Sequence, residues 1–196
     1  MRIVRKLRFV LNLPALREHL FTGAIGSENA SRMDDGKVTR QDPFQIRKAD
    51  ATDANGIADC LTAAFVPHRN QYTAAAYADT VLNHEGVLRR LQDMCLFVAV
   101  SKGQIVGTVS CVGNGLEGHL RGMAVLPDWH GTGVAAALLG AAEAEIKRNG
   151  CSLITLDTTE PLVKAIRFYR KHGYSASGRV TDFFGMRLFE YRKVLH

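Results

Sequence analysis

The stretch that decides the fold runs from residue 123 to residue 139 and reads MAVLPDWHGTGVAAALL. Its first four residues are apolar, as in a buried strand, and Pro127 ends them. A short loop containing Gly131 and Gly133 then leads into an alanine- and leucine-rich helix. The first turn of a helix has free backbone N–H groups and the positive end of the helix dipole, and both favour an anion. The stretch therefore predicts a strand–turn–helix unit that binds a phosphate-bearing cofactor.

The two glycines alone do not identify that cofactor. The dinucleotide-binding fingerprint needs a third glycine, and Ala136 stands at that position. The phosphate loop of nucleotide hydrolases does not match either, because neither Lys-Ser nor Lys-Thr follows the glycines. The alternative is a strand–turn–helix unit in which small residues simply allow close packing. The local pattern leaves both interpretations open.

The composition is that of a globular chain. It has 196 residues, 46% of them hydrophobic, which suits one domain with an extension. No apolar run approaches the roughly 20 residues that span a bilayer, so no membrane span is expected. A formal net charge of +6 fits a polyanionic small ligand or a nucleic acid. Since the body of the chain has no basic stripe with interleaved aromatic residues, no nucleic acid is expected as a partner.

The four cysteines of the sequence do not have the spacing of a metal site. There is no Cys-x-x-Cys pair, and no pair of histidines has zinc-ligand spacing, so no metal is expected. Cys95 and Cys111 lie in or beside apolar runs, where a free cysteine acts as a small hydrophobic residue. We interpret all the cysteines as reduced thiols of a cytoplasmic protein. A nucleophilic Cys111 is the alternative.

Residues 1–43 differ from the rest of the chain. Residues 1–17 include basic side chains and no acidic one, with apolar residues at near-helical spacing. Pro14 interrupts this pattern, and a polar, turn-rich segment follows. We expect a weakly ordered basic extension over 1–43. A targeting peptide or a helix on a membrane surface is the alternative.

From Phe44 onward, strand and helix patterns follow one another without internal repeats. Asp50 or Thr52 is expected to cap a helix that runs through Phe65, and Gly173 to end the last helix. Further helices are expected over 72–93, 131–149 and 161–172, and strands over 44–47, 96–100, 105–112, 117–126, 153–158, 174–180 and 186–194. This order predicts one α/β (α+β) domain over 44–196, a mixed sheet with helices on its faces.

This order and two motif blocks resemble the GNAT superfamily of acyl-CoA N-acyltransferases. The first block is HGTGVA at 130–135, where the family has Arg or Gln, two residues, Gly, one residue, and Gly or Ala. His130 departs from that pattern. The second block, AIRFYRKHGY at 165–174, resembles the family signature Ala-x-x-Phe-Tyr-x-x-x-Gly-Phe. Leu162 stands where the family often has Asn.

The resemblance covers about residues 44–196 and implies a mostly antiparallel central sheet with one splayed strand pair. The strand that ends at Leu126 and the strand over 153–158 would form this pair. Acetyl-CoA, the acyl donor of the family, would lie in the gap, with its pyrophosphate on backbone N–H groups of 131–136. An unpaired strand edge suits a ligand that acts as a surrogate strand. The cofactor-binding residues that the resemblance implies are Met123, Ala124, Val125, His130, Gly131, Thr132, Gly133, Val134, Ala135, Ala136 and Tyr169.

Acyl transfer to an amine needs a base for the amine, a partner for the oxyanion and an acid for the departing thiolate. The resemblance implies Tyr169 as the acid and the backbone N–H of Val125 as the oxyanion partner. A phenol has a pKa close to that of a thiol, so the proton transfer carries little thermodynamic penalty. The alternative for Tyr169 is a core aromatic residue beside Phe168.

The base is expected on the strand over 117–126, where some members of the family have a carboxylate. Residues two apart in a strand share a face. One face should therefore present Glu117, His119, Arg121 and Met123, and the other Leu120, Gly122 and Ala124. Glu117 and His119 are the candidate bases, acting through water, and Asp157 is a weaker one. The alternative for Glu117 and His119 is a solvated residue at the sheet edge, and Arg121 either holds a substrate carboxylate or is simply exposed.

The expected function is an acetyl-CoA-dependent N-acetyltransferase acting on a primary amine of a small molecule or a protein. The first alternative is a non-catalytic acyl-CoA-binding regulatory module, favoured by His130, by Leu162 and by the lack of an obvious base. The second is a nucleic-acid or membrane-surface protein that acts through residues 1–17. The sequence leaves open whether the protein forms a homodimer. Candidates for an acceptor pocket, or else for the core, are Phe65, His68, Tyr72, Phe183 and Phe184.

Overall fold

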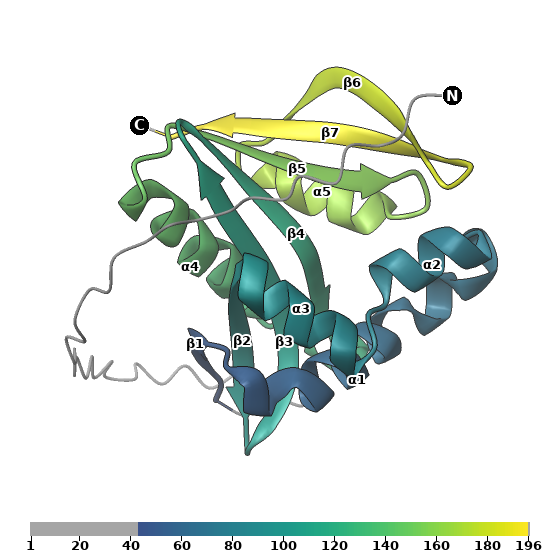
Figure 1. The fold of residues 1–196 in the computed structure, drawn as a ribbon, viewed down its shortest axis with the longest axis vertical. Helices are drawn as coiled ribbons and strands as arrows, with labels where there is room; N and C mark the ends of the chain where they lie inside the picture. Colours follow the sequence, from purple (N-terminus) through teal and green to yellow (C-terminus); the bar gives the residue numbers. More distant parts are fainter. Residues whose placement is uncertain (1–42, 196) are drawn as a thin grey trace, which may run out of the picture. The chain divides into compact units, whose positions relative to one another are not determined.

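One seven-stranded sheet organises residues 43–195, the part of the chain that the computed structural model describes (Figure 1). The strands lie in the order β1-β2-β3-β4-β5-β7-β6, and every neighbouring pair is antiparallel except β4 and β5. Their bounds are β1 Gln45–Lys48, β2 Cys95–Ser101, β3 Gln104–Asn114, β4 Glu117–Val125, β5 Leu153–Thr159, β6 Ser175–Phe183 and β7 Met186–Val194. This confirms the expected mixed, mostly antiparallel sheet. The extension predicted over 1–43 lies outside the described residues, apart from Pro43.

Helices cover both faces of the sheet. Their bounds are α1 Ala54–Phe65, α2 Ala74–Thr80, α3 His84–Asp93, α4 Val134–Arg148 and α5 Val163–Lys171. One buried cluster joins α4 and α5 to the sheet through Leu138, Ile146 and Tyr169. A second cluster joins α1, α2 and α3 to the other face, around Ile57 and Val87, and Figure 1 shows the two helix groups on opposite sides. In the described part of the chain, no helix is both long and apolar enough to cross a membrane.

Three predicted helix boundaries are wrong, two of them for a reason that the local structure shows. The helix expected over 72–93 is two helices, because Asn83 caps a new one by accepting the N–H of Gly86 at 2.9 Å. The helix expected over 131–149 begins at Val134, since Gly131 and Gly133 have φ values of 81° and 91°. That left-handed region is open to glycine and does not continue a helix. The helix expected from residue 161 begins at Val163.

The two parallel strands, β4 and β5, pair only where they begin. Residues 117–120 lie opposite residues 153–156, and beyond this point the pairing stops. The backbone of residues 123–125 is therefore open on the side that faces β5. This gap is the splayed strand pair expected from the sequence.

A bulge at Gly122 interrupts the regular alternation of β4. Ser110 pairs with Arg121 and Thr108 with Ala124, so β4 has one residue more than β3 between these two pairs. Gly122 has a φ of 64°, a conformation that glycine adopts without strain.

The bulge turns the residues after it onto the opposite faces. Leu120 packs with the α4 cluster, whereas Ala124 packs with the α1 cluster. Met123 packs with the α4 cluster, away from the face of Glu117 and His119. Met123 was expected on the same face of the strand as His119, and Ala124 on the same face as Leu120. Both expectations are wrong, because the alternation of side chains between the two faces is interrupted at the bulge.

Candidate functional site

The loop before α4 presents backbone donors at the start of a helix. A 3-10 turn, η3 Pro127–Trp129, leads through Gly131 to Gly133, which is the N-cap of α4. Glycine has no side chain with which to cap the helix, so the N–H groups of its first turn remain available. A Cβ on Gly131 or Gly133 would meet nothing within 4 Å, so the positive φ, rather than a lack of space, requires glycine there. Of the predicted residues 131–136, those of the first turn from Val134 to Ala136 therefore present N–H donors, whereas Thr132 donates its N–H to the carbonyl of Trp129 at 3.4 Å.

The strand edge beside this loop is open at Val125. Leu126 donates its N–H to the carbonyl of Val106 at 2.9 Å and so faces β3. Because successive backbone groups of a strand point to opposite sides, the N–H and C=O of Val125 face the gap toward β5. The Nε2 atom of His130 lies 3.1 Å from the carbonyl oxygen of Val125. The residue that departs from the motif thus holds the glycine loop against the strand.

Tyr169 reaches the same strand from α5. Its hydroxyl donates to Sδ of Met123 at 3.5 Å, and 8% of the residue is exposed. A thioether is a weak acceptor, so the phenolic proton lies beside a sulfur atom without a strong bond. Burial raises the pKa of Tyr169, which keeps the phenol protonated. Tyr169 is therefore a core aromatic, with Phe168 and Tyr174 edge-on against it, and its buried hydroxyl is a hydrogen-bond donor.

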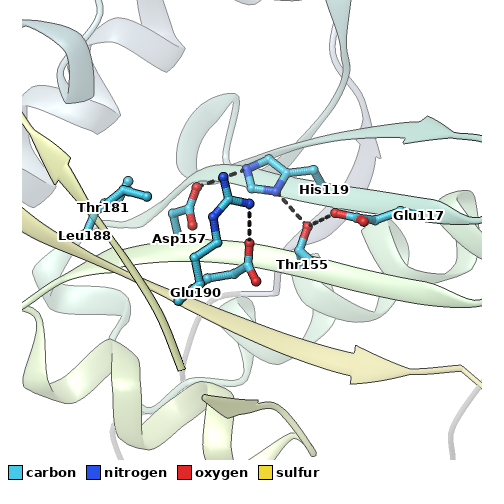
Figure 2. A pocket seen from close by; sticks show the side chains of 8 residues that line it. Glu117, His119, Thr155, Asp157, Thr181, Leu188 and Glu190 are labelled. Carbon is cyan, nitrogen blue, oxygen red and sulfur yellow. Dashed lines mark hydrogen bonds and ion pairs between the residues drawn. The ribbon is translucent and has the colours of Figure 1, made fainter. Parts of the chain in front are cut away.

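A polar pocket of about 150 Å³ opens on the face of the sheet opposite α4 and α5, and Figure 2 shows its side chains converging. The residues that line it are Glu117, His119, Thr155, Asp157, Arg179, Thr181, Leu188 and Glu190. Strand register brings them together, since His119 lies opposite Thr155 and Asp157 opposite Glu190. The structure thus gathers Glu117, His119 and Asp157, the three candidate bases, in one place. Sequence reasoning missed the β6 and β7 residues, because no motif marks the pairing of β5 with β7.

A chain of hydrogen bonds sets the tautomer of His119 (Figure 2). The hydroxyl of Thr155 donates to Oε1 of Glu117 at 2.9 Å. Its oxygen can then accept from Nδ1–H of His119, 3.0 Å away. With the proton on Nδ1, Nε2 has the free lone pair. Nε2 lies 3.7 Å from Oδ2 of Asp157, at the pocket, where the neutral ring can accept a proton.

The electrostatics of the pocket favour a neutral His119. Burial lowers the pKa of His119 below its ordinary value, and the Asp157 carboxylate acts in the opposite direction. Burial also raises the pKa of Asp157, with His119 opposing that shift. Glu190 is paired with Arg179 at 3.3 Å. Within residues 43–195, no group of three or more His, Cys, Asp or Glu side chains has an arrangement that could hold a metal ion.

The sequence of this domain matches the model of the Acetyltransferase (GNAT) family over residues 56–174. The chain belongs to the GNAT family. The match contains both splayed strands, the glycine loop and Tyr169. Membership of the GNAT family supports an acyltransferase activity, and acetyl-CoA as acyl donor fits the family.

Solved GNAT structures share this fold. The PaiA N-acetyltransferase of Thermoplasma acidophilum, solved with coenzyme A, has 17% identity and a TM-score of 0.65, covering 78% of this chain and 99% of that one. YncA of Salmonella typhimurium, solved with acetyl-CoA, has 20% identity and a TM-score of 0.60, with 78% and 94% covered. The ribosomal-protein-S18-alanine N-acetyltransferase of Escherichia coli has 14% identity and a TM-score of 0.65, with 78% and 94% covered.

In this GNAT fold the predicted site residues divide between the two faces of the splayed strands. Met123, His130 and Tyr169 lie on the side of α4 and α5, and Glu117 and His119 lie in the polar pocket. The aromatic residues considered for an acceptor pocket lie elsewhere. Phe65 and Tyr72 are 7% exposed in the α1 cluster, Phe183 packs against that cluster, His68 is half-buried and Phe184 is 52% exposed.

Proposed function

We propose that this protein is an acetyl-CoA-dependent N-acetyltransferase that acts on a primary amine of a small molecule or a protein. One observation carries the proposal: β4 has an open backbone edge at 123–125 and, a few residues earlier, a polar pocket with a neutral histidine. The edge suits the acyl-pantetheine arm as a surrogate strand, and the pocket suits the amine. Bound acetyl-CoA supplies the activated acetyl group.

The pyrophosphate of the donor is assigned to the N–H groups of residues 131–136. The positive end of the α4 dipole acts on the same place, so charge and hydrogen bonding favour one anionic group there. Because these donors belong to the backbone, they do not depend on an Arg or Gln at position 130. This accounts for the presence of His130, whose ring is bound to Val125.

His119 is the residue we assign as base. Its Nε2 accepts the proton of the attacking amine through water, because Val125, the oxyanion partner, lies six residues further along β4. The Thr155 hydroxyl holds Nδ1–H in place, and the Glu117 charge behind it stabilises the imidazolium that forms. Glu117 therefore acts through His119 rather than as a separate base.

The remaining two roles belong to the open edge and to α5. The N–H of Val125 donates to the oxygen that becomes negative as the C–N bond forms. Tyr169 donates its proton to the thiolate that leaves as the C–S bond breaks. The proton taken by His119 passes to solvent, and solvent reprotonates Tyr169, so the protons balance.

A non-catalytic acyl-CoA-binding module is the second candidate. The observation that favours it is the bond from His130 to the carbonyl of Val125, because a pantetheine amide would otherwise use this acceptor. The two candidates share the binding surface and differ in turnover.

We also propose a cytoplasmic location. The four cysteines, Cys60, Cys95, Cys111 and Cys151, are free thiols, and such thiols persist in a reducing compartment.

Calorimetric titration with acetyl-CoA, followed by a CoA-release assay over a panel of amines and peptides, tests the proposal. We expect binding and amine-dependent release. Binding with no release over the whole panel would favour the module, and no binding would contradict both candidates.

A further inference from the structure

The face of β4 that presents His119 has opposite charges on its two sides. Toward β5 and β7 lie the carboxylates of Asp157 and Glu190 in the polar pocket, and Glu190 is paired there with Arg179. Toward α2 and α3 lie two guanidinium groups, those of Arg121 and Arg90. The carboxylates and the guanidinium groups therefore lie on opposite sides of His119, whose Nε2 atom we assign as base.

Arg121 lies two residues after His119 on the same face, before the bulge. Its guanidinium is hydrogen-bonded to Asp79 of α2. Two residues of a strand span about 7 Å, and the two side chains point to different partners, His119 toward Asp157 and Arg121 toward Asp79. The charge of Arg121 is close enough to lower the pKa values of both His119 and Asp157.

Arg90 comes from α3 and lies over the bulge. A Cβ on Gly122 would overlap its Nη1 atom, so glycine at this position leaves room for the guanidinium as well as satisfying a φ of 64°. The pKa of Arg90 is lowered to about 10, first by burial and then by the positive charge of Arg121. Asp79 opposes that shift, but its carboxylate is already bonded to Arg121. In the described part of the chain, two guanidinium groups thus share one carboxylate, and an additional anion would complement them.

We propose that the acceptor is a zwitterionic small amine of the amino-acid class. Its carboxylate lies on Arg121 and Arg90, and its amino group reaches Nε2 of His119 through water, on the side of Asp157 and Glu190. A diamine has no group for the arginine pair, and the amino terminus of a protein has a neutral peptide group where the carboxylate would be. This inference rests on the proposed N-acetyltransferase function and selects the small-molecule branch of it.

The test compares matched acceptors in an acetyl-CoA assay: free amino acids, their carboxamides, and the corresponding decarboxylated amines with the same side chains. Since a charge-assisted bidentate contact is lost in the last two sets, we expect kcat/KM to fall about 10- to 100-fold from acid to carboxamide. Arg121→Gln and Arg90→Gln should remove this preference by raising KM for the acids, so that acids and carboxamides then have similar kcat/KM values. Arg121 is more exposed than Arg90, so its replacement disturbs the packing less than that of Arg90. The Arg121 variant therefore tests the inference even if the Arg90 variant does not fold.

Arg89→Gln is the matched control. Arg89 is on the same helix and is exposed, with Glu85 at 3.7 Å as its partner, so the preference for acids should stay unchanged. Equal rates with acids and carboxamides, or best rates with carboxylate-free amines, would overturn the inference while leaving the proposed function in place. No CoA release with any amine would contradict the proposed function, and the inference with it.

Discussion

The Nε2 atom of His130 donates a hydrogen bond to the carbonyl oxygen of Val125 across 3.1 Å. The bond joins the glycine loop to the open edge of β4, the two elements that we assign to acetyl-CoA. The side chain that departs from the motif therefore shapes the gap between the strands, while the backbone N–H groups of the loop are the ones that we assign to acetyl-CoA.

Replacing His130 should affect donor binding less than replacing a loop glycine. His130→Ala should change the Kd for acetyl-CoA by less than about tenfold, because a single hydrogen bond contributes about 1 kcal/mol net. Gly133→Ala should weaken binding more, since a φ of 91° is strained for an L-residue and relief of that strain moves the N–H donors. Calorimetry measures both, with Gly140→Ala in α4 as the control that should leave Kd unchanged. Greater dependence on His130 than on Gly133 would show that the side chain, and not the backbone, binds the phosphates.

Tyr169→Phe should slow turnover and spare binding. The variant keeps the ring and its edge-on contacts and removes the proton that we assign to the departing thiolate. We expect kcat to fall about 100-fold or more, with the Kd for acetyl-CoA nearly unchanged. Loss of binding, or an unchanged kcat, would assign Tyr169 to the core alone.

The pH dependence of kcat/KM should report the titration of His119. Activity rises with pH as Nε2 loses its proton, and the midpoint should lie below the ordinary value of 6.5, because burial lowers the pKa. Asp157 acts in the opposite direction, so Asp157→Asn should move the midpoint to still lower pH. Glu160→Gln, just after β5, is the control for loss of a carboxylate outside the pocket. The acceptor amine titrates in the same way with the unmodified protein and with both variants, so it does not affect the comparison. If Asp157→Asn left the midpoint unchanged, this would argue against His119 as base.

Adding a methyl group at the contact between α4 and β4 should destabilise the protein. A Cβ on Gly118 would overlap Cγ2 of Ile146, a fully buried side chain. Gly118→Ala should lower the free energy of unfolding by about 1–3 kcal/mol through overpacking. Gly140→Ala, on the open side of the same helix, should raise it by about 0.5–1 kcal/mol. Urea denaturation of the two variants checks the opposite signs.

The elements with strong local signals could be predicted from the sequence. The apolar strand pattern of 105–112, the glycine loop and the Ala-x-x-Phe-Tyr block each predict a strand or helix within a few residues of its observed bounds. The break between α2 and α3 was not predicted, because the helical pattern continues through Asn83, the residue that caps α3. The order of the strands in the sheet was not predicted, since strand spacing alone does not say that β7 lies between β5 and β6.

The candidate site was only partly predictable, for two physical reasons. The bulge at Gly122 adds one residue to β4, which reverses the alternation of side chains between the two faces. The face on which Met123 lies could therefore not be predicted from the sequence. Thr155 and Glu190 owe their place to cross-strand register, which depends on partners far away in the chain. The family resemblance, together with the alternation of β4, indicated His119 as a candidate base, and the tertiary structure supplies the groups that set its tautomer and its pKa.

The most direct test of the central claim is amide hydrogen exchange of the protein with and without saturating acetyl-CoA. If the donor lies in the gap between β4 and β5, exchange should slow at residues 123–125 and 131–136 and stay unchanged in α2 and in the β6–β7 hairpin. Protection confined to other segments, or no protection at saturation, would contradict the claim that the splayed strands and the glycine loop bind the donor.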